Sequence, residues 1–369
     1  MHEINEIVKR FETTGEFVEV KPYGTGHIND TYLSTFKNDS GHHHYIHQRI
    51  NHEIFTKPAE LMENICRVTE HLKEKFTQMG EDTSRRCLSL VQTRSGEMYH
   101  VTEDGNYWRT YNFITGARTY DKVENLDHVN GASRAFAEFQ MMVSDLPGEP
   151  LHETIPDFGN ARFRFEQFRQ ALDADSQNRA QNCQPEIQFA LDRKEITDVI
   201  EDLISAGKLP RRIAHYDTKF NNVMIDDKTG EGICVIDLDT VMPGTVTYDF
   251  GDSVRIGAST AAEDETDLSK VSMNLEMFDR LAQGYLSIAK DFLTDVEIDH
   301  LAFSAKLITF VIGLRFLADH LAGDVYFKTH REGHNLDRAR TQFKMVADME
   351  SKFDKMQEII RRYAQRSAV

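Results

Sequence analysis

The stretch IAHYDTKFNNVMID (residues 213–226) places a histidine, an aspartate and two asparagines between aliphatic residues. Two interpretations fit this pattern. In the first, the polar side chains cap a turn between two buried elements. In the second, the stretch is a catalytic loop, in which Asp217 meets a substrate and Asn222 holds a metal ion. The combination of His215, Asp217 and Asn222 at this spacing favours the catalytic loop once the segment that follows it is considered.

Two aspartates end the next apolar segment. Asp237 follows the run Ile233–Ile236, and Asp239 stands two positions further on. The segments NVMID and GICVIDLD flank the turn Asp227–Gly232 and predict a hairpin, which would bring Asn222 close to Asp237. Their amide and carboxylate oxygens are ligands that Mg²⁺ accepts together with phosphate oxygens. This arrangement meets the requirements of phosphoryl transfer, which needs bound cations and an aimed hydroxyl group.

The composition is that of an ordinary globular protein, with 40% hydrophobic and 28% charged residues in 369. The formal charge of −17 argues against nucleic acid or an anionic membrane as the main partner. It raises no such objection to ATP bound with Mg²⁺, because a local site is neutralised by the metal. Four widely spaced cysteines indicate reduced thiols.

We expect a cytoplasmic protein that does not cross a membrane. The first 15 residues carry charges throughout and lack the apolar core of a signal peptide. In the most hydrophobic segment, residues 301–323, only the eight residues Leu307–Leu314 lie between the charged Lys306 and Arg315, and a membrane span needs about 20 apolar residues. This segment predicts a buried helix. No obligate protein partner is indicated.

The order of patterns predicts an α+β protein with a small β-rich lobe, residues 1–115, and a larger helical lobe, residues 116–369. Pro58 begins a helix of the first lobe, with apolar residues at helical spacing up to Leu72. The connector between the lobes is expected at residues 111–117. Six stretches of the first lobe are predicted to supply a meander of about five strands: residues 16–23, 31–36, 45–50, 87–93, 97–102 and 106–114.

Several stretches along nearly the whole chain resemble the aminoglycoside phosphotransferase and choline kinase family, whose fold is protein-kinase-like and bilobal. They are YGTGHINDTYL, FNNVMID, IDLDTVMPG, YDFGDSVRIGAST, LRFLADHLAGDVYF and HNLDRARTQ. Within this family the chain is most similar to bacterial kinases of N-acetylated hexoses. The resemblance implies that ATP and Mg²⁺ are used to phosphorylate the anomeric hydroxyl of N-acetylglucosamine or N-acetylgalactosamine.

The resemblance also implies roles for the loop residues. Asp217 occupies the catalytic position and would orient the C1 hydroxyl or accept its proton, while Asn222 and Asp237 occupy metal-ligand positions. Asp239 is either a second ligand or holds an arginine or backbone groups nearby. Lys219 either meets the transferring phosphate or is a solvated lysine.

The ATP side is expected in the first lobe. Gly24, Thr25 and Gly26 could lie over the phosphates with exposed backbone N–H groups, although such a triplet is also an ordinary turn. The connector around Tyr111 and Phe113 should offer backbone groups to adenine.

Strand YIHQRI departs from the family pattern, in which a lysine or arginine reaches the phosphates. Gln48 takes the position of that lysine. Either a neutral donor suffices, or Arg49 serves from a shifted register.

The acceptor sugar is expected near the apolar segment that ends in ADHLAGDVYF. Arg315 and Asp319 stand four residues apart and could simply pair with each other. A buried helix rarely tolerates charges unless they are paired or used, so we expect Arg315 and Tyr326 to contact the sugar. The remaining candidates for the sugar pocket are Asp324, His27, Asn29 and Asp217.

Other functions compete with this one. A protein kinase is disfavoured, because little chain separates Asp237 from Asp249 and no Ala-Pro-Glu motif is present. A kinase of choline, an aminoglycoside or another small alcohol is a nearer rival. Gln48 also permits an inactive nucleotide-binding scaffold, against which the set of Asp217, Asn222 and Asp237 argues. The preferred sugar, its configuration at C4 and the oligomeric state are not readable from the sequence.

Overall fold

The chain folds into two compact units, which are described separately. The computed structural model describes residues 2–24, 28–120 and 126–365. The first unit comprises the residues up to Thr119 together with Met142–Pro156 and Val223–Met242, and the second unit comprises the remainder. The first unit is therefore assembled from three separate segments of the chain.

The first unit contains a five-stranded antiparallel sheet with the strand order β1-β2-β3-β5-β4. Most of the predicted strands are confirmed, although residues 87–93 form no regular strand. That segment joins β5 only through an isolated bridge at Leu90 and a few backbone hydrogen bonds. The strands are β1 (Glu16–Pro22), β2 (Asp30–Asn38), β3 (Gly41–Ile50), β4 (His100–Val101) and β5 (Tyr107–Asn112).

The turn between β2 and β3 is tighter than expected. Asn38 pairs with Gly41, so only two residues form the turn, and Gly41 has a φ of 126°. Glycine tolerates this conformation, which lets β3 begin early. Residues His42–His44 therefore belong to β3, which begins at Gly41 and not at Tyr45, where the predicted strand began.

Several helical segments belong to the first unit. The predicted helix is confirmed as α2 (Pro58–Gln78), which buries its apolar stripe and has Pro58 in its first turn. Near the N-terminus, α1 (His2–Ile7) and η1 (Val8–Arg10) contribute to an apolar cluster with Phe36, Tyr45 and Trp108 of the sheet. The short helix α3 (Thr83–Arg86) follows α2.

The predicted hairpin is confirmed in a second sheet of the first unit. Strand β8 (Val223–Asp226) lies between β6 (Ala117–Arg118) and β9 (Gly232–Val235), and all pairs are antiparallel. After β9 the chain passes through Asp237 into the 3-10 turn η5 (Leu238–Thr240). Asp237 has a φ of 59° and a ψ of 60°, a left-handed conformation that costs free energy in any residue but glycine.

The second unit is mainly helical, so the expected order of a β-rich part followed by a helical part is confirmed. Strand β7 pairs with β10, two of whose three residues lie in this unit. The elements are α4 (Leu126–Val143, whose last two residues belong to the first unit), α5 (Ala161–Ala174), η2 (Ala180–Asn182), α6 (Gln184–Leu191), η3 (Lys194–Thr197), α7 (Val199–Ser205), β7 (Arg212–Ala214), η4 (Phe220–Asn222), β10 (Met242–Gly244), α8 (Val246–Gly257), η6 (Leu268–Lys270), α9 (Leu275–Ala289), α10 (Asp295–Asp299), α11 (Leu301–Ala322) and α12 (His334–Tyr363).

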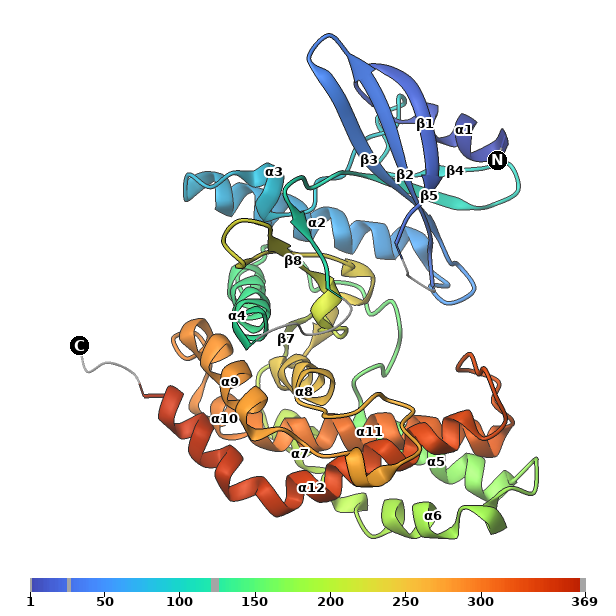
Figure 1. Ribbon diagram of the computed structural model, residues 1–369, viewed down its shortest axis with the longest axis vertical. Helices are drawn as coiled ribbons and strands as arrows, with labels where there is room; N and C mark the ends of the chain where they lie inside the picture. Colours follow the sequence, from blue (N-terminus) through green and yellow to red (C-terminus); the bar gives the residue numbers. More distant parts are fainter. Residues whose placement is uncertain (1, 25–27, 121–125, 366–369) are drawn as a thin grey trace. The chain divides into compact units, whose positions relative to one another are not determined.

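Helix α11 is the centre of the second unit and packs against α8 and α12 (Figure 1). A Cβ atom added to Gly251 of α8 would lie 2.5 Å from the carbonyl oxygen of Ser304, so glycine permits this close approach. By length and composition α11 could cross a membrane, but 78% of its most apolar window is buried inside the protein. This burial agrees with the expected core helix.

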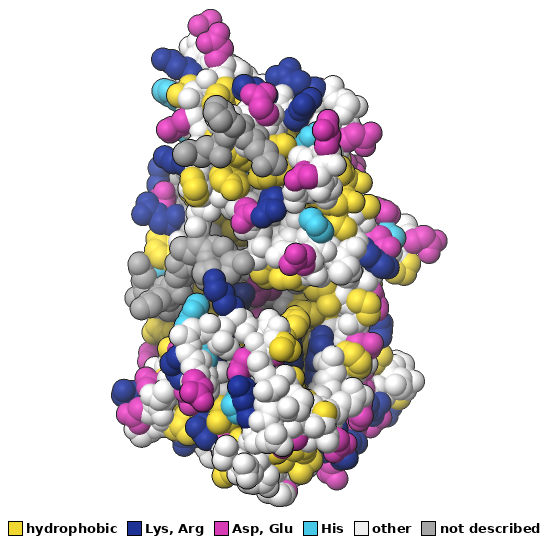
Figure 2. Space-filling model, turned by 90° about the vertical axis from the view of Figure 1, so that its right-hand side faces the viewer, with side chains coloured by type: hydrophobic (Ala, Val, Ile, Leu, Met, Phe, Trp, Pro, Cys, Tyr) yellow, Lys and Arg dark blue, Asp and Glu magenta, His cyan; other side chains and the backbone are white. Residues whose placement is uncertain are grey.

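Charged side chains of both signs are interspersed on the face of the molecule shown in Figure 2. On that face the acidic side chains do not gather into one patch, although the whole chain has a net charge of −17.

Candidate active site

The loop after β7 is held by the buried carboxylate of Asp249. The backbone N–H groups of His215 and Tyr216 donate to its two oxygens, each at 2.8 Å, and Gln140 donates at 2.7 Å. Burial raises the pKa of Asp249 to about 7, against the effect of these donors, which favour the ionised form. Asp249 therefore fixes the backbone of the loop just before Asp217.

His215 itself is fully buried. Its ring packs edge-on against Phe136 and Phe139, with centroids 5.4 and 5.8 Å away. The next residue, Tyr216, has a φ of 66°, so the chain turns sharply just before Asp217. This apolar environment supports a structural role for His215 in the core.

Asp217 is fixed by two neighbours in the loop. The Lys219 ammonium lies 2.8 and 3.0 Å from its two carboxylate oxygens. The Asn222 amide donates to the backbone oxygen of Asp217 at 2.8 Å and to its carboxylate at 3.1 Å. Because the amide N–H₂ group faces Asp217, the amide oxygen is the atom of Asn222 that could bind a cation. The loop thus brings together three of the predicted residues.

In the first unit, Asp239 holds an arginine. Its Oδ1 lies 2.5 Å from Nη1 of Arg109, and its Oδ2 accepts a hydrogen bond of 2.6 Å from Asn29. Of the two roles considered for Asp239, this geometry favours binding an arginine over binding a metal. Asn29 also accepts from the backbone N–H of Asn51 at 3.0 Å, so its amide is bonded at both ends.

Arg109 was missed by the sequence analysis. It is only 1% exposed, and its Nε and Nη2 atoms donate to Oε1 of Gln48 at 3.0 and 2.8 Å. The strand register pairs Gln48 directly with Arg109. Only the knowledge that these two strands are neighbours could have pointed to it.

The register also separates Gln48 from Arg49. Arg49 is exposed and donates to Asp30 at 2.7 Å and to Asn106 at 3.2 Å. Since side chains alternate along a strand, Arg49 points away from the face that carries Gln48 and Arg109. Its role toward ATP stays a prediction that this arrangement does not favour.

The remaining predicted ATP residues lie at the sheet. Gly24 has a φ of 77°, whereas Thr25, Gly26 and His27 lie outside the described residues. Tyr111 is buried, with its ring centroid 5.4 Å from the Arg109 guanidinium carbon. The backbone N–H of Phe113 donates to His44 at 3.1 Å. Nucleotide contacts by these residues stay predictions.

In the second unit, Arg315 and Tyr326, the residues predicted to contact the sugar, lie together. Arg315 donates to the Tyr326 hydroxyl at 3.3 Å, and its guanidinium carbon lies 5.3–5.6 Å from the ring centroids of Phe158, Tyr326 and Phe327. Tyr326 is 67% exposed. These two side chains form an accessible surface of aromatic rings and one guanidinium group.

The two aspartates of this region, Asp319 and Asp324, bind groups other than Arg315. Asp319 does not pair with Arg315 but accepts three backbone N–H groups, of Val325, Tyr326 and Phe327, at 2.8–2.9 Å. Asp324 binds Arg179 at 2.6 Å and accepts from Asn335 at 2.9 Å. Asp319 therefore shapes the segment that carries Tyr326, and the contacts of Asp324 support a structural role.

A second arginine, Arg164 of α5, shares this surface and was also missed. Its guanidinium carbon lies 5.8 Å from the Phe158 ring, which Arg315 contacts as well. Burial, followed by the charge of Arg315, lowers the pKa of Arg164. Within the described residues neither arginine forms an ion pair with a carboxylate.

The donor atoms suit magnesium in their chemistry. Asp237 offers a carboxylate and Asn222 an amide oxygen, which are hard oxygen ligands. In the described part of the chain, no three His, Cys, Asp or Glu side chains gather into a metal site. Few protein ligands are sufficient for Mg²⁺ when nucleotide phosphates and water supply the others.

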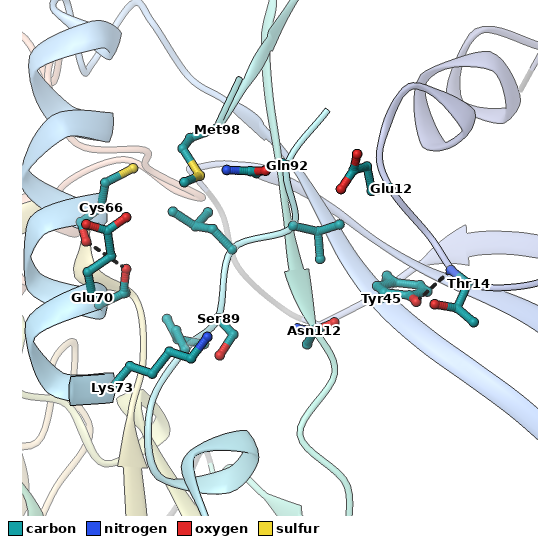
Figure 3. A pocket seen from close by; sticks show the side chains of 14 residues that line it. Glu12, Thr14, Tyr45, Cys66, Glu70, Lys73, Ser89, Gln92, Met98 and Asn112 are labelled. Carbon is teal, nitrogen blue, oxygen red and sulfur yellow. Dashed lines mark hydrogen bonds between the residues drawn. The ribbon is translucent and has the colours of Figure 1, made fainter. Parts of the chain in front are cut away.

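A cavity of about 420 Å³ in the first unit is lined by residues other than those predicted to bind ATP (Figure 3). Figure 3 shows Cys66, Glu70 and Lys73 of α2 on one side and Tyr45 and Thr14 on the other. By strand alternation Tyr45 points to the sheet face opposite to Gln48 and Arg109. The cavity is therefore not the expected nucleotide site.

Comparison with known proteins agrees with this architecture. A model of the phosphotransferase enzyme family matches residues 19–283. An aminopropanol kinase associated with microcompartments has a TM-score of 0.58 and 15% identity, with 96% of this chain and 98% of that chain covered. An aminoglycoside phosphotransferase from Alicyclobacillus acidocaldarius has a TM-score of 0.58 and 13% identity, covering 98% and 96%. A choline kinase from Cryptosporidium parvum has a TM-score of 0.54 and 15% identity, covering 94% and 93%.

At such identities the structural matches establish the fold, which is protein-kinase-like, as the sequence predicted. The family model covers well over half of the chain. This protein is therefore a member of the phosphotransferase enzyme family.

Proposed function

We propose that this phosphotransferase is an ATP-dependent N-acetylhexosamine 1-kinase. It would transfer the γ-phosphoryl group of ATP to the anomeric hydroxyl of N-acetylglucosamine or N-acetylgalactosamine, giving ADP and the sugar 1-phosphate. The observation that carries the assignment to a sugar is the pair of arginines beside an exposed aromatic surface, Arg164 and Arg315.

The loop residues would perform the transfer. The carboxylate of Asp217 orients the C1 hydroxyl and accepts its proton as the oxygen attacks the γ-phosphorus. Lys219, paired with Asp217, offers positive charge close to the transferring group. Asn222 and Asp237 would hold Mg²⁺, which, when bound, neutralises charge on the phosphate oxygens.

The arginine pair supports a neutral acceptor rich in oxygen. Guanidinium groups donate well to hydroxyl and carbonyl oxygens, and a flat aromatic ring suits the apolar face of a sugar and an acetyl methyl group. A cationic acceptor would meet two like charges, and such juxtaposition costs several kcal/mol. This argues against an amino alcohol or an aminoglycoside, the acceptors after which the fold relatives are named.

The test is an acceptor panel with Mg-ATP, in which ADP release is measured for both N-acetylhexosamines, choline, ethanolamine, 1-amino-2-propanol and an aminoglycoside. We expect kcat/KM for the best N-acetylhexosamine to exceed that for every cationic acceptor by about 100-fold or more. A cationic acceptor that is used best would refute the proposal.

The variant Arg315→Gln should raise the KM for the sugar by about 10- to 100-fold, because a hydrogen bond to a charged group contributes about 1.5–3 kcal/mol. The KM for ATP should hardly change. Arg362→Gln, at an exposed arginine that binds Asp279, is the matched control. Equal effects of Arg315→Gln on both KM values would remove Arg315 from the sugar pocket.

A further inference from the structure

Strand β3 carries no cation where kinases of this fold normally place one. That lysine reaches the α- and β-phosphates, and here the position is held by Gln48. The next strand of the sheet carries Arg109 directly opposite, and its side chain is only 1% exposed. A charge so deeply buried must be paired and hydrogen-bonded.

Arg109 belongs to a continuous network of polar side chains in the first unit. Arg109 lies 2.5 Å from Asp239 and donates twice to Gln48. Gln48 in turn donates to Thr31 at 3.2 Å, and Asp239 accepts from Asn29 at 2.6 Å. The network thus links β2, β3 and β5 of the sheet to η5.

The network keeps Arg109 charged. Burial by itself would lower the pKa of Arg109, but Asp239 in the first place, then Tyr111 and Asp237, raise it above its usual value. Asp237 stands two residues before Asp239 and enters η5 in a left-handed conformation.

A purely structural ion pair is the alternative. Buried pairs are often no more stabilising than well-packed apolar residues, so stability alone gives a weak reason for this arrangement. The location of the pair gives a stronger reason. The contact between Arg109 and Asp239 joins the sheet to the turn η5, and Asp239 stands two residues after Asp237. The neutral Gln48 also fits a role for Arg109 beyond stability. Its side-chain oxygen accepts hydrogen bonds from the guanidinium of Arg109, whereas a lysine at position 48 would repel that guanidinium.

We propose that Arg109 is a positioning residue for phosphoryl transfer, which supplies from β5 the positive charge that β3 lacks and holds Asp237 in place through Asp239. The inference rests on the proposed function only in that the site binds a magnesium nucleotide. It does not depend on which acceptor is used. Moving the charge back from β5 to β3 should therefore preserve much of the function.

The experiment compares Arg109→Met, Gln48→Lys and the double variant with wild type. The primary measurement is the affinity for Mg-ADP by calorimetry, which needs no acceptor, and thermal unfolding checks each fold. We expect Arg109→Met to weaken Mg-ADP binding by up to about 100-fold, the upper end of the loss typical when a side chain that positions a metal ligand is removed. Gln48→Lys should weaken it too, because two cations then share one carboxylate. The double variant should recover affinity to within about 10-fold of wild type.

Arg118→Met, at an exposed arginine of the same unit that binds Asp227, should leave the affinity unchanged. If wild type does not bind Mg-ADP, the proposed function fails. If wild type binds and folded Arg109→Met binds equally well, the inference about Arg109 fails. If Arg109→Met does not fold, the double variant decides, because a folded double variant without affinity for Mg-ADP contradicts the proposal that a charge on β3 can replace Arg109.

Discussion

The imidazole of His47 should make the stability of the N-terminal sheet depend on pH. His47 is fully buried in β3, where its two ring nitrogens bond to Ser34 at 2.7 Å and Thr110 at 2.8 Å. Burial lowers the pKa of His47 from 6.5 to about 3. The folded protein thus keeps a neutral imidazole at a pH at which the unfolded chain binds a proton.

The difference in the pKa of His47 between the folded and the unfolded chain sets the direction and the size of the effect on stability. The stabilisation is complete above pH 6.5 and is lost progressively as pH falls from 6.5 toward 3, because only the unfolded state gains the proton. Each unit of pH in this window costs about 1.4 kcal/mol. Between pH 7 and pH 5, His47 alone should therefore remove about 2 kcal/mol from the free energy of unfolding.

The single tryptophan offers a local probe, because Trp108 is buried in β5 of the same sheet. Urea unfolding followed by its fluorescence should be measured for wild type and His47→Gln between pH 7 and pH 5. The free-energy difference between the two proteins should shift by about 2 kcal/mol in favour of the variant as pH falls. Ser34→Ala is the control, since it removes a hydrogen bond but keeps the buried imidazole and hence the slope. Parallel curves for wild type and His47→Gln would refute the reasoning.

Three further substitutions test the candidate site and its support. Asp217→Asn should lower kcat by about 10²- to 10⁴-fold while Mg-ADP affinity stays within about 3-fold, and wild-type turnover would contradict its assigned role. Asp249→Asn leaves a backbone N–H of the loop facing an amide N–H₂ group, which should cost about 1–3 kcal/mol in urea unfolding and reduce kcat; an unchanged kcat would show that the loop does not need this anchor. Gly251→Ala should lower the free energy of unfolding by about 1–3 kcal/mol, because its Cβ would lie 2.5 Å from a backbone oxygen of α11; an unchanged Tm would mean that α8 and α11 can separate at little cost.

Local signals in the sequence account for the elements that were predicted well. Pro58 and the apolar stripe after it define α2, and the turn at Asp227–Gly232 defines the β8–β9 hairpin. The loop from His215 to Asn222 was also predictable, because its spacing is short and the contacts between Asp217 and Asn222 lie within the loop. Residues 87–93 alternate like a strand but form only scattered bonds to β5, since tertiary pairing and not alternation decides whether a strand is regular.

The missed residues depend on contacts far apart in the sequence. Arg109 becomes significant only when β3 and β5 are known to be neighbours and Asp239 is known to lie beneath them. Arg164 stands in the charged helix segment ARFRFEQFR, which is typical of a solvated surface. Its closeness to Arg315 arises from folding alone.

The most direct measurement of the proposed function is the ³¹P NMR spectrum of the product formed from N-acetylglucosamine and Mg-ATP by the wild-type protein. An anomeric phosphate couples to the single proton on C1, so we expect a doublet that appears as ATP is converted to ADP. A phosphorus signal coupled to the two protons of C6, or no sugar phosphate from either N-acetylhexosamine, would contradict the assignment.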